Sequence, residues 1–347
     1  MGAQPFLKNQ WYVCARAHEV NRKPLARMIC GEPLVFYRCE DGRAVALSDR
    51  CPHRQYPLSK GQLIHDEIEC GYHGLRFGAD GRCKLIPAQS TVPDGFGTRA
   101  YPLVERNSLV YVWIGDAALA DPAGIPDFHE NGGPGWAAEV DHLRVEANWQ
   151  LIVDNLMDLT HLTFVHKTTL ASSGIQENPL NVTVEGDVVR ARREMPNVEP
   201  APIFRTMRHF DGNIDRFQNL SFLLPNHVHI RIEACPTGVK DDPDLVHHVV
   251  LNHLTPETER TTHYFWSICR RMHINDPKVG DLLKRMNATA FDEDKYILAD
   301  QQKMIDTDPD GGMLVNLEAD KAVGAVRRII RHKLREEAAL AVKGDQK

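Results

Sequence analysis

The chain has 347 residues, of which 42% are hydrophobic and 25% are charged, and its formal net charge is −6 at pH 7. This composition is typical of a soluble globular protein with room for two domains, and the acidic balance argues against nucleic acid or a membrane surface as a partner. The sequence has no apolar run near the roughly 20 residues of a membrane span, and its start, MGAQPFLKNQWYV, lacks the apolar core of a signal peptide. We therefore expect a cytoplasmic protein.

The first hundred or so residues are dominated by short β-branched and aromatic runs, broken by Gly, Asp and Asn, that predict β strands. These runs are residues 11–17, 33–39, 44–49, 68–77 and 108–115. Asp41-Gly42 and Asp80-Gly81 are strong hairpin signals between such runs. The Gly-, Pro- and Asp-rich stretch from about residue 116 to 136 predicts a linker.

The second part of the chain mixes helices and strands. A helix is predicted from Trp149 to about Val165, and two more at about 276–304 and 317–342. Strands are predicted at 182–194, 217–235, 245–258 and 262–272. The fold class is therefore α+β: an all-β domain over residues 1–118, followed by residues 119–347 as an α+β domain with an antiparallel sheet flanked by helices.

Four residues in the first domain have the spacing of metal ligands. CPHR and CGYHG place Cys51, His53, Cys70 and His73 in two short loops, each with one cysteine and one histidine. Such a set can bind zinc, but zinc fingers usually separate their cysteines from their histidines. The mixed loops favour a Rieske [2Fe–2S] cluster, in which two cysteines hold one iron and two histidines the other.

The other six cysteines have no such spacing, and in a cytoplasmic chain of this size we interpret them as unpaired thiols. They are Cys14, Cys30, Cys39, Cys83, Cys235 and Cys269.

A second group of ionisable residues lies in the helical segment DNLMDLTHLTFVH, residues 154–166. On a regular helix Asp158 and His161 share a face, whereas His161 and His166 lie roughly 140° apart. An amphipathic helix with hydrogen-bonded histidines explains the segment equally well on spacing alone. If both histidines bind one metal, the helix must bend, bulge or end between them, and a π-type turn is plausible there.

A Rieske cluster transfers single electrons and needs an acceptor, and an iron held by two histidines and one carboxylate is such an acceptor. The segment AFDEDKYILADQQK offers Asp292, Glu293, Asp294 and Asp300 as the carboxylate, and spacing does not choose among them.

These motifs together resemble the Rieske non-haem iron oxygenases, in particular the vanillate O-demethylase, dicamba O-demethylase and toluenesulfonate methyl-monooxygenase group. The likeness covers NQWYVCA, CPHR…CGYHGLRF, YPLVERNSLVYVWIGD, DNLMDLTHLTFVH, LTPETE and FDEDK, nearly the whole chain. It implies that residues 1–118 form the Rieske domain and residues 119–347 the catalytic domain.

The resemblance also implies roles for single residues. Cys51, His53, Cys70 and His73 would hold the cluster. His161, His166 and Asp294 would bind the mononuclear Fe(II), with Asn155 beside it. Asp158 would be the bridging acid between a cluster histidine and His161.

In this family the working pair of metals forms across subunits of a head-to-tail homotrimer, so His73 of one chain would approach Asp158 of the next. A reductase with flavin and [2Fe–2S] would supply electrons from NADH or NADPH. The implied reaction is hydroxylation of a methoxy or methyl carbon of an aromatic acid with O₂, and O-demethylation would release formaldehyde. Ring hydroxylation and a simple Rieske electron carrier are the alternatives.

The sequence says less about the substrate. Residues 227–234 alternate, so Arg231 shares a strand face with His227 and His229 and could pair with a carboxylate or sulfonate. A solvated strand face is the alternative. By the resemblance, Asn252 stands where dicamba O-demethylase has a substrate-binding histidine, and the surroundings of Arg285 also differ, so dicamba is not the expected substrate.

Overall fold

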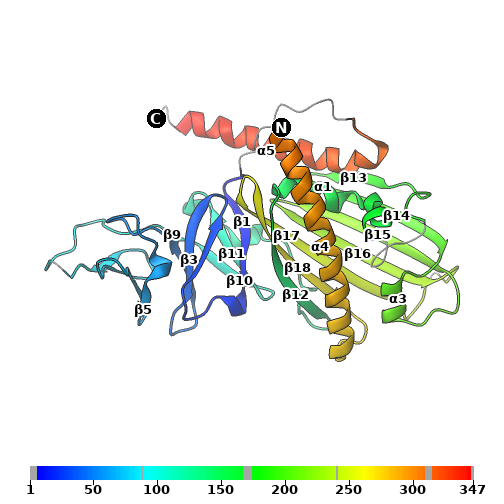
Figure 1. Cartoon of the computed structure of the whole chain (residues 1–347), viewed down its shortest axis with the longest axis horizontal. Helices are drawn as coiled ribbons and strands as arrows, with labels where there is room; N and C mark the ends of the chain where they lie inside the picture. The colour runs from blue at the N-terminus through cyan, green and yellow to red at the C-terminus, as the bar shows by residue number, and fades with distance from the viewer. Residues whose placement is uncertain (1–5, 88, 167–173, 240, 309–314, 345–347) are drawn as a thin grey trace. The chain divides into compact units, whose positions relative to one another are not determined.

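The computed structural model describes residues 6–87, 89–166, 174–239, 241–308 and 315–344 (Figure 1). The chain divides into two compact units. One consists of Lys8–Ile125 and Thr255–Thr258, and the other of Met1–Leu7, Pro126–Leu254 and Glu259–Lys347. We call them the N-terminal unit and the C-terminal unit. No helix of the described part is long and apolar enough to cross a membrane.

In the part of the N-terminal unit that the structure describes, the strands are short and form three small sheets. The first sheet has the order β1 (Gln10–Arg16), β11 (Leu109–Ile114), β10 (Leu103–Arg106). The second has the order β2 (Leu25–Ile29), β3 (Glu32–Arg38), β4 (Ala44–Ser48), β9 (Ala100–Tyr101). The third has the order β5 (Gln62–Ile64), β6 (Glu67–Glu69), β7 (Arg76–Phe77), β8 (Cys83–Leu85). Single 3₁₀ turns lie at Ala17–Glu19, Leu58–Lys60, Ala117–Leu119 and Pro122–Gly124.

The hairpins of this unit occur where the Asp-Gly pairs predict them. Gly42 and Gly81 have φ angles of 89° and 77°, a backbone region that glycine enters without steric cost. Gly42 joins β3 to β4, and Gly81 joins β7 to β8. The predicted strand over 68–77 is interrupted, because residues 70–75 form a loop between β6 and β7.

The C-terminal unit is built on one seven-stranded antiparallel sheet, as predicted. Its order is β12 (Ala137–Val145), β18 (Thr261–Arg270), β17 (Val246–Thr258), β16 (His227–Pro236), β15 (Ile214–Leu223), β14 (Val188–Val198), β13 (Asn181–Glu185). Its helices are α1 (Trp149–Met157), α2 (Leu162–Val165), α3 (Pro202–Met207), α4 (Pro277–Thr307) and α5 (Lys321–Gly344). Single 3₁₀ turns lie at Leu159–His161 (η5) and Glu318–Asp320 (η6).

The predicted strands 182–194 and 217–235 are each a hairpin of two strands, β13–β14 and β15–β16. The strand β12 and the helix α3 lie outside every predicted element of this unit. The strand β12 pairs with β18 from Ala137↔Arg270 to Val145↔Thr262, and its residues alternate too weakly to stand out after the linker. The helix α3 has only six residues and begins at Pro202, a residue suited to a first helical position. The two long helices α4 and α5 confirm the predicted ones within a few residues.

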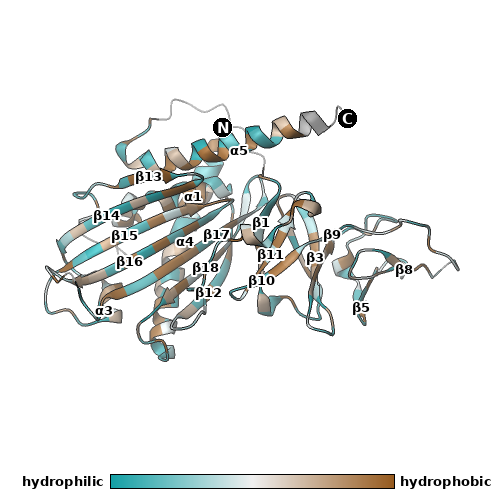
Figure 2. Cartoon of the chain, turned by 180° about the vertical axis from the view of Figure 1, so that it is seen from behind, coloured by the Kyte–Doolittle hydropathy of each residue, from teal (hydrophilic) through white to brown (hydrophobic). Residues whose placement is uncertain are grey.

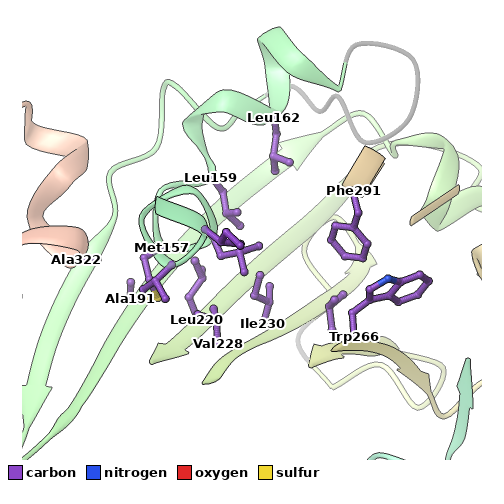
Figure 3. Close-up of a cluster of buried hydrophobic side chains, with 14 of the residues drawn as sticks. Met157, Leu159, Leu162, Ala191, Leu220, Val228, Ile230, Trp266, Phe291 and Ala322 are labelled. Carbon is purple, nitrogen blue, oxygen red and sulfur yellow. The ribbon is translucent and has the colours of Figure 1, made fainter. Parts of the chain in front are cut away.

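The main core of the C-terminal unit lies between one face of the sheet and its helices. Figure 3 shows Met157, Leu159 and Leu162 packed against Leu220, Val228 and Ile230 of the sheet, with Phe291 of α4 beside Trp266. Along β15, buried and half-buried residues alternate, and the buried set contains the polar Arg216 and Gln218 as well as apolar residues. Figure 2 shows that hydrophobic and hydrophilic segments both occur along the strands of this sheet. One face of the sheet therefore packs against α1 and α4, and a site can form between this face and the two helices.

Candidate metal centres

Two loops of the N-terminal unit, at Cys51 and Cys70, have the same backbone hydrogen bonds. In each loop the cysteine amide donates to the carbonyl five residues later, and the amide four residues later donates back to the cysteine carbonyl, at 2.8–2.9 Å. The partners are Tyr56 and Gln55 in the first loop, and Leu75 and Gly74 in the second. Gln55 and Gly74 both have positive φ, 59° and 72°. The two motifs thus fold as a matched pair.

The four predicted cluster ligands project from these loops. Cys51 and Cys70 are buried, at 2% and 1% exposure, whereas His53 and His73 are exposed. The two imidazole rings lie close together, with centroids 4.6 Å apart and ring planes 59° apart. Two thiols and two imidazoles are the donor set of a Rieske cluster, in which the cysteines would hold one iron and the histidines the other.

The loops are held in place by close contacts behind them. A Cβ added at Gly61 would lie 1.8 Å from the carbonyl oxygen of Glu69, so only glycine permits this approach. Asp49 accepts hydrogen bonds from the Ser59 amide at 2.7 Å and the Ser59 hydroxyl at 2.6 Å. All eight cysteines are buried and outside disulfides, which agrees with the prediction that the six cysteines other than Cys51 and Cys70 are unpaired thiols.

In the C-terminal unit, the predicted helix from Trp149 to Val165 is broken at Asp158. α1 ends at Met157, and Asp158 is extended, with φ −123° and ψ 97°. The turn η5 and the short helix α2 follow, and α2 ends before His166. A helix end does fall between the two histidines, because α2 stops at Val165, but the main break lies earlier than predicted, at Asp158 before His161. It consists of an extended residue and a 3₁₀ turn, and the described residues have no π-type turn there.

The break brings His161 and His166 to the same side as Asp294 of α4. The ligand atoms of these three residues all lie within 4.8 Å of one another. Asp294 Oδ1 is 3.6 Å from His161 Nε2 and 3.2 Å from His166 Nε2. Among the described residues, this is the one group of three or more such side chains that converges in this way.

Each histidine is oriented by a hydrogen bond on its other ring nitrogen. His161 Nδ1 donates to the carbonyl oxygen of Asp158 at 2.7 Å, and His166 Nδ1 lies 2.7 Å from Glu293 Oε2. These partners leave both Nε2 atoms free to bind a metal, as is usual for metal-binding histidines. The donor set, two imidazoles and one carboxylate, fits a non-haem Fe(II) with open positions.

The electrostatics of the site also favour a cation. Burial alone would lower the pKa of His166, but the Asp294 and Glu293 carboxylates outweigh it and raise the pKa. The site therefore stabilises positive charge at this imidazole, where a metal ion would take the place of the proton.

Asp294 interrupts the apolar stripe of α4. The buried residues of this helix recur every three or four positions: Gly280, Leu283, Asn287, Ala290, Phe291, Asp294, Leu298 and Gln302. A carboxylate at such a position, only 5% exposed, is a signal that helical periodicity alone could have provided. Asp292 and Asp300 are exposed, and Glu293 contacts His166 as a supporting group that sequence reasoning did not assign.

The other acids and the amide of this segment have separate contacts. Asn155 Nδ2 donates to Asp294 Oδ1 at 3.2 Å, as expected of a neighbour of the site. Asp158 Oδ1 accepts from the Thr160 amide at 2.9 Å. Asp154, for which the sequence offered no role, accepts hydrogen bonds from Arg327 of α5 and from Gln150.

A cavity opens beside the three converging residues, with about 650 Å³ of space free of atoms, part of it open to solvent. His161, His166 and Asp294 all line it. Much of the remaining wall is apolar: Leu156, Leu159, Leu162, Ile203, Phe204, Ile230, Ile232, Val250, Ala290 and Phe291. Its polar residues are Arg216, Gln218, His248 and Asn287.

The two residues predicted to contact substrate do not line this cavity. Ile230 and Ile232 face the cavity, so Arg231 between them projects from the opposite face of the sheet, where its Nη2 is 3.6 Å from Glu130 Oε1. Arg231 therefore does not contact substrate in this cavity, and the alternative of a solvated strand face describes it better, since its side chain is 41% exposed. Asn252 is fully buried and accepts a hydrogen bond from Tyr264 at 2.7 Å while donating to the carbonyl oxygen of Val228.

Family comparisons agree with both parts of the chain. Residues 10–102 match the Rieske [2Fe–2S] domain, and residues 145–336 match the vanillate O-demethylase oxygenase C-terminal domain.

Similar proteins match along nearly the full length. A putative toluene-4-sulfonate monooxygenase system iron–sulfur subunit of Comamonas testosteroni is 36% identical over 95% of this chain and 98% of its own. A vanillate O-demethylase oxygenase subunit of a Pseudomonas strain is 35% identical over 97% of each chain. The crystal structure of dicamba monooxygenase bound to dicamba has a TM-score of 0.91 and 33% identity, covering 97% of this chain and 100% of that one.

Proposed function

This chain belongs to the Rieske oxygenase components of the vanillate O-demethylase family, and we propose that it hydroxylates a methoxy or methyl carbon of an aromatic acid. The observation that carries the proposal is the convergence of His161, His166 and Asp294 on the wall of a largely apolar cavity. Oxidising a C–H bond there requires a metal that activates O₂ and a pocket that excludes water. It also requires a group that delivers electrons to the metal, which the [2Fe–2S] cluster would provide.

We assign residues 1–118 to the Rieske domain and residues 119–347 to the catalytic domain. Cys51, His53, Cys70 and His73 would hold the [2Fe–2S] cluster, and His161, His166 and Asp294 the mononuclear iron. When bound, the two groups supply single electrons and the activation of O₂.

The chain's own residues orient and shield this chemistry. The Asp158 carbonyl and the Glu293 carboxylate hold the two imidazoles with Nε2 toward the metal position. Asn155 donates to Asp294 Oδ1 and keeps that carboxylate directed at the same point. The apolar wall excludes water, which favours oxidation of the substrate over side reactions.

The product chemistry distinguishes this reaction from its alternatives. Hydroxylation of a methoxy carbon gives a hemiacetal, which loses formaldehyde and leaves a phenol. Each turnover uses one O₂ and two electrons with two protons, and one oxygen atom leaves as water. A methyl substrate would give the corresponding alcohol.

The test is a panel of methoxybenzoates and toluene-4-sulfonate, supplied to the metal-loaded chain with NADH and a Rieske-type reductase. We expect O₂ uptake matched by formaldehyde or by a benzylic alcohol. A hydroxylated ring would replace the proposal with ring hydroxylation. If the cluster is reduced but no acid of the panel causes O₂ uptake, the result would instead support a simple Rieske electron carrier.

The names of the relatives, oxygenase components and subunits of larger systems, support a separate reductase as partner. We further propose a head-to-tail homotrimer in which His73 of one protomer approaches Asp158 of the next. Such heterologous contacts close into rings. Measuring the mass in solution and the turnover rate of the same sample tests this. A monomer that turns over at full rate would contradict the proposal.

Asp158 is then the bridge for electron transfer between protomers. Asp158→Asn keeps an oxygen that can accept from the Thr160 amide, so the backbone at the break should be preserved. We expect both metals to remain bound while reduction of the mononuclear iron by the cluster slows. Unchanged single-turnover kinetics in this variant would remove the bridging role.

A further inference from the structure

Three polar side chains lie on the sheet wall of the metal-site cavity. Arg216, Gln218 and His248 are 4%, 0% and 1% exposed. Gln218 of β15 pairs with Ile232 of β16, and Ile232 pairs with His248 of β17. Gln218, Ile232 and His248 therefore form one row across the sheet. Arg216 precedes Gln218 by two residues on β15 and therefore shares its face.

Several polar atoms of these side chains are buried without a hydrogen-bond partner among the described residues. The unpartnered atoms are Nε and Nη1 of Arg216, both polar side-chain atoms of Gln218, and Nδ1 of His248. A buried polar group without a partner costs about 1–3 kcal/mol, and a charged group costs more. Three such groups on one wall indicate that their partner is a molecule that enters the cavity.

The charge on this wall is positive. Burial lowers the pKa of Arg216 to about 10, so the guanidinium stays protonated at neutral pH. Its neighbouring charge is Arg193, also buried, and the guanidinium lies 5.0 Å from the centre of the Phe204 ring. Burial holds the pKa of His248 at about 3, so this imidazole is neutral and serves as a hydrogen-bonding group.

The remaining lining divides the cavity into surfaces of different chemistry. His161, His166 and Asp294 form the metal-binding surface, and residues such as Leu156, Val250 and Phe291 form an apolar one. An aromatic acid has matching parts: a carbon to be oxidised, an apolar ring and an anionic group. Uncharged aromatic compounds would leave the Arg216 guanidinium unpaired.

We propose that Arg216, with Gln218 and His248, binds the anionic group of the aromatic substrate, a carboxylate or a sulfonate, and so selects acids over neutral analogues. This rests on the proposed function, because it names the group that orients the substrate at that site. The guanidinium fork donates two parallel hydrogen bonds to an oxyanion, and the Gln218 amide adds a third donor.

The experiment is equilibrium binding to the metal-loaded chain under nitrogen, measured by calorimetry. The probes are 4-methoxybenzoate, toluene-4-sulfonate and the neutral 4-methoxybenzamide. We expect the wild type to bind one or both acids at least about tenfold more tightly than the amide. Arg216→Met should weaken binding of the acid about 30-fold and change binding of the amide less than about threefold. Comparison of the two acids decides between carboxylate and sulfonate.

Two further variants control for indirect effects. Arg231→Met removes a cation from the opposite face of the same sheet, and it should leave acid binding unchanged. Arg216→Lys keeps the charge and should retain part of the preference for acids. Wild-type protein that binds the amide as tightly as both acids would overturn the proposal without any variant, and so would acid binding that survives Arg216→Met.

The outcomes separate this inference from the proposed reaction. If acids bind through Arg216 but yield neither formaldehyde nor a benzylic alcohol, the reaction is wrong and the anion site stands. If neutral methoxyarenes release formaldehyde and no acid is preferred, the reaction stands and the anion site is wrong.

Discussion

The two candidate metal centres of this chain are assembled in opposite ways. In the N-terminal unit the ligands come from two loops within residues 51–73, and each loop closes through its own backbone hydrogen bonds. In the C-terminal unit His161 and His166 meet Asp294, which is 128 residues beyond His166 and lies on a different helix. The first centre depends on local turns, whereas the second depends on the packing of α1, η5, α2 and α4.

Because of this difference, substitutions at different kinds of position should disturb the two centres. A locally closed pair of loops is affected mainly by changes to its ligands or turn residues. A centre that joins distant elements is also sensitive to residues that position those elements, since small displacements of a helix move a ligand.

The largest expected effects come from removing one ligand at each centre. Cys70→Ser should abolish the visible absorption of the cluster and leave iron at the histidine site. Asp294→Ala should do the reverse. Each should lower turnover by more than about 100-fold. Loss of a residue that only supports a ligand costs up to about 100-fold, and loss of the ligand itself should cost more. Iron content and visible spectra of the purified variants measure this, and loss of both metals in either variant would contradict the separation.

A smaller effect is expected from the support of His166. Glu293→Ala removes the carboxylate at Nδ1 and should weaken iron binding about 10–100-fold, with the cluster spectrum unchanged. Glu293→Gln keeps an acceptor oxygen and should recover part of the affinity. The exposed neighbour Asp292→Ala is the matched control, and iron titration of the three variants gives the comparison. Equal affinity in Glu293→Ala and the wild type would show that the contact is incidental.

Stability of the second centre's scaffold should depend on the contact between α1 and α5. Arg327 donates to Asp154, and burial raises the pKa of Asp154 despite this cation. Arg327→Met should lower the free energy of unfolding of the C-terminal unit by about 2 kcal/mol, because it strands a mostly buried carboxylate. Arg328→Met, an exposed neighbour on the same helix, should have little effect. Denaturant unfolding followed by circular dichroism checks both, and a cluster spectrum lost before the helical signal would argue against local destabilisation.

The smallest expected effect is a pH dependence in the N-terminal unit. Burial alone would raise the pKa of Glu19, but hydrogen bonds from Arg27 and the Arg16 amide outweigh it and lower the pKa to about 2. Because the folded-state pKa lies below the unfolded one, this carboxylate stabilises the fold fully above about pH 4.5. That contribution is lost as the pH falls toward 2, and it is at most about 2 kcal/mol after solvent screening.

Glu19→Gln tests this sign. The variant should be less stable than the wild type at pH 7, and the gap should close between pH 4.5 and 2. A gap that persists or widens at low pH would mean that the hydrogen bonds, and not the charge, are what the unit loses. Unfolding followed by the cluster absorption measures this unit separately from the helices.

Much of the site could be predicted from the sequence, but for different reasons at different residues. The spacing of Cys51, His53, Cys70 and His73 predicts their loops, because each pair lies within one turn. Spacing alone does not identify His161 and His166 as ligands, since a regular helix would place them on different faces. The Rieske motif upstream and the family resemblance together favour the metal site. Asp294 stood among four nearby acids, and its position in the buried stripe of α4 distinguishes it in the structure.

The substrate wall shows where pattern reading failed. The sequence leaves Arg231 with two alternatives, a substrate contact or a solvated strand face, and the structure favours the second because its neighbours Ile230 and Ile232 line the cavity. Alternation defines two faces of a strand, but not which of them a helix covers. Arg216, Gln218 and His248 were overlooked because they are separated in sequence by up to 32 positions and meet only through strand pairing.

The sequence by itself determined the all-β and α+β halves, the cluster loops and the family, because these depend on local turn chemistry and on motifs of a few residues. The tertiary structure decided which carboxylate meets the two histidines, how the break at Asp158 orients them, and which sheet face carries the buried cation. Those features depend on contacts between elements far apart in the chain, where packing selects one arrangement from several that local preferences allow equally.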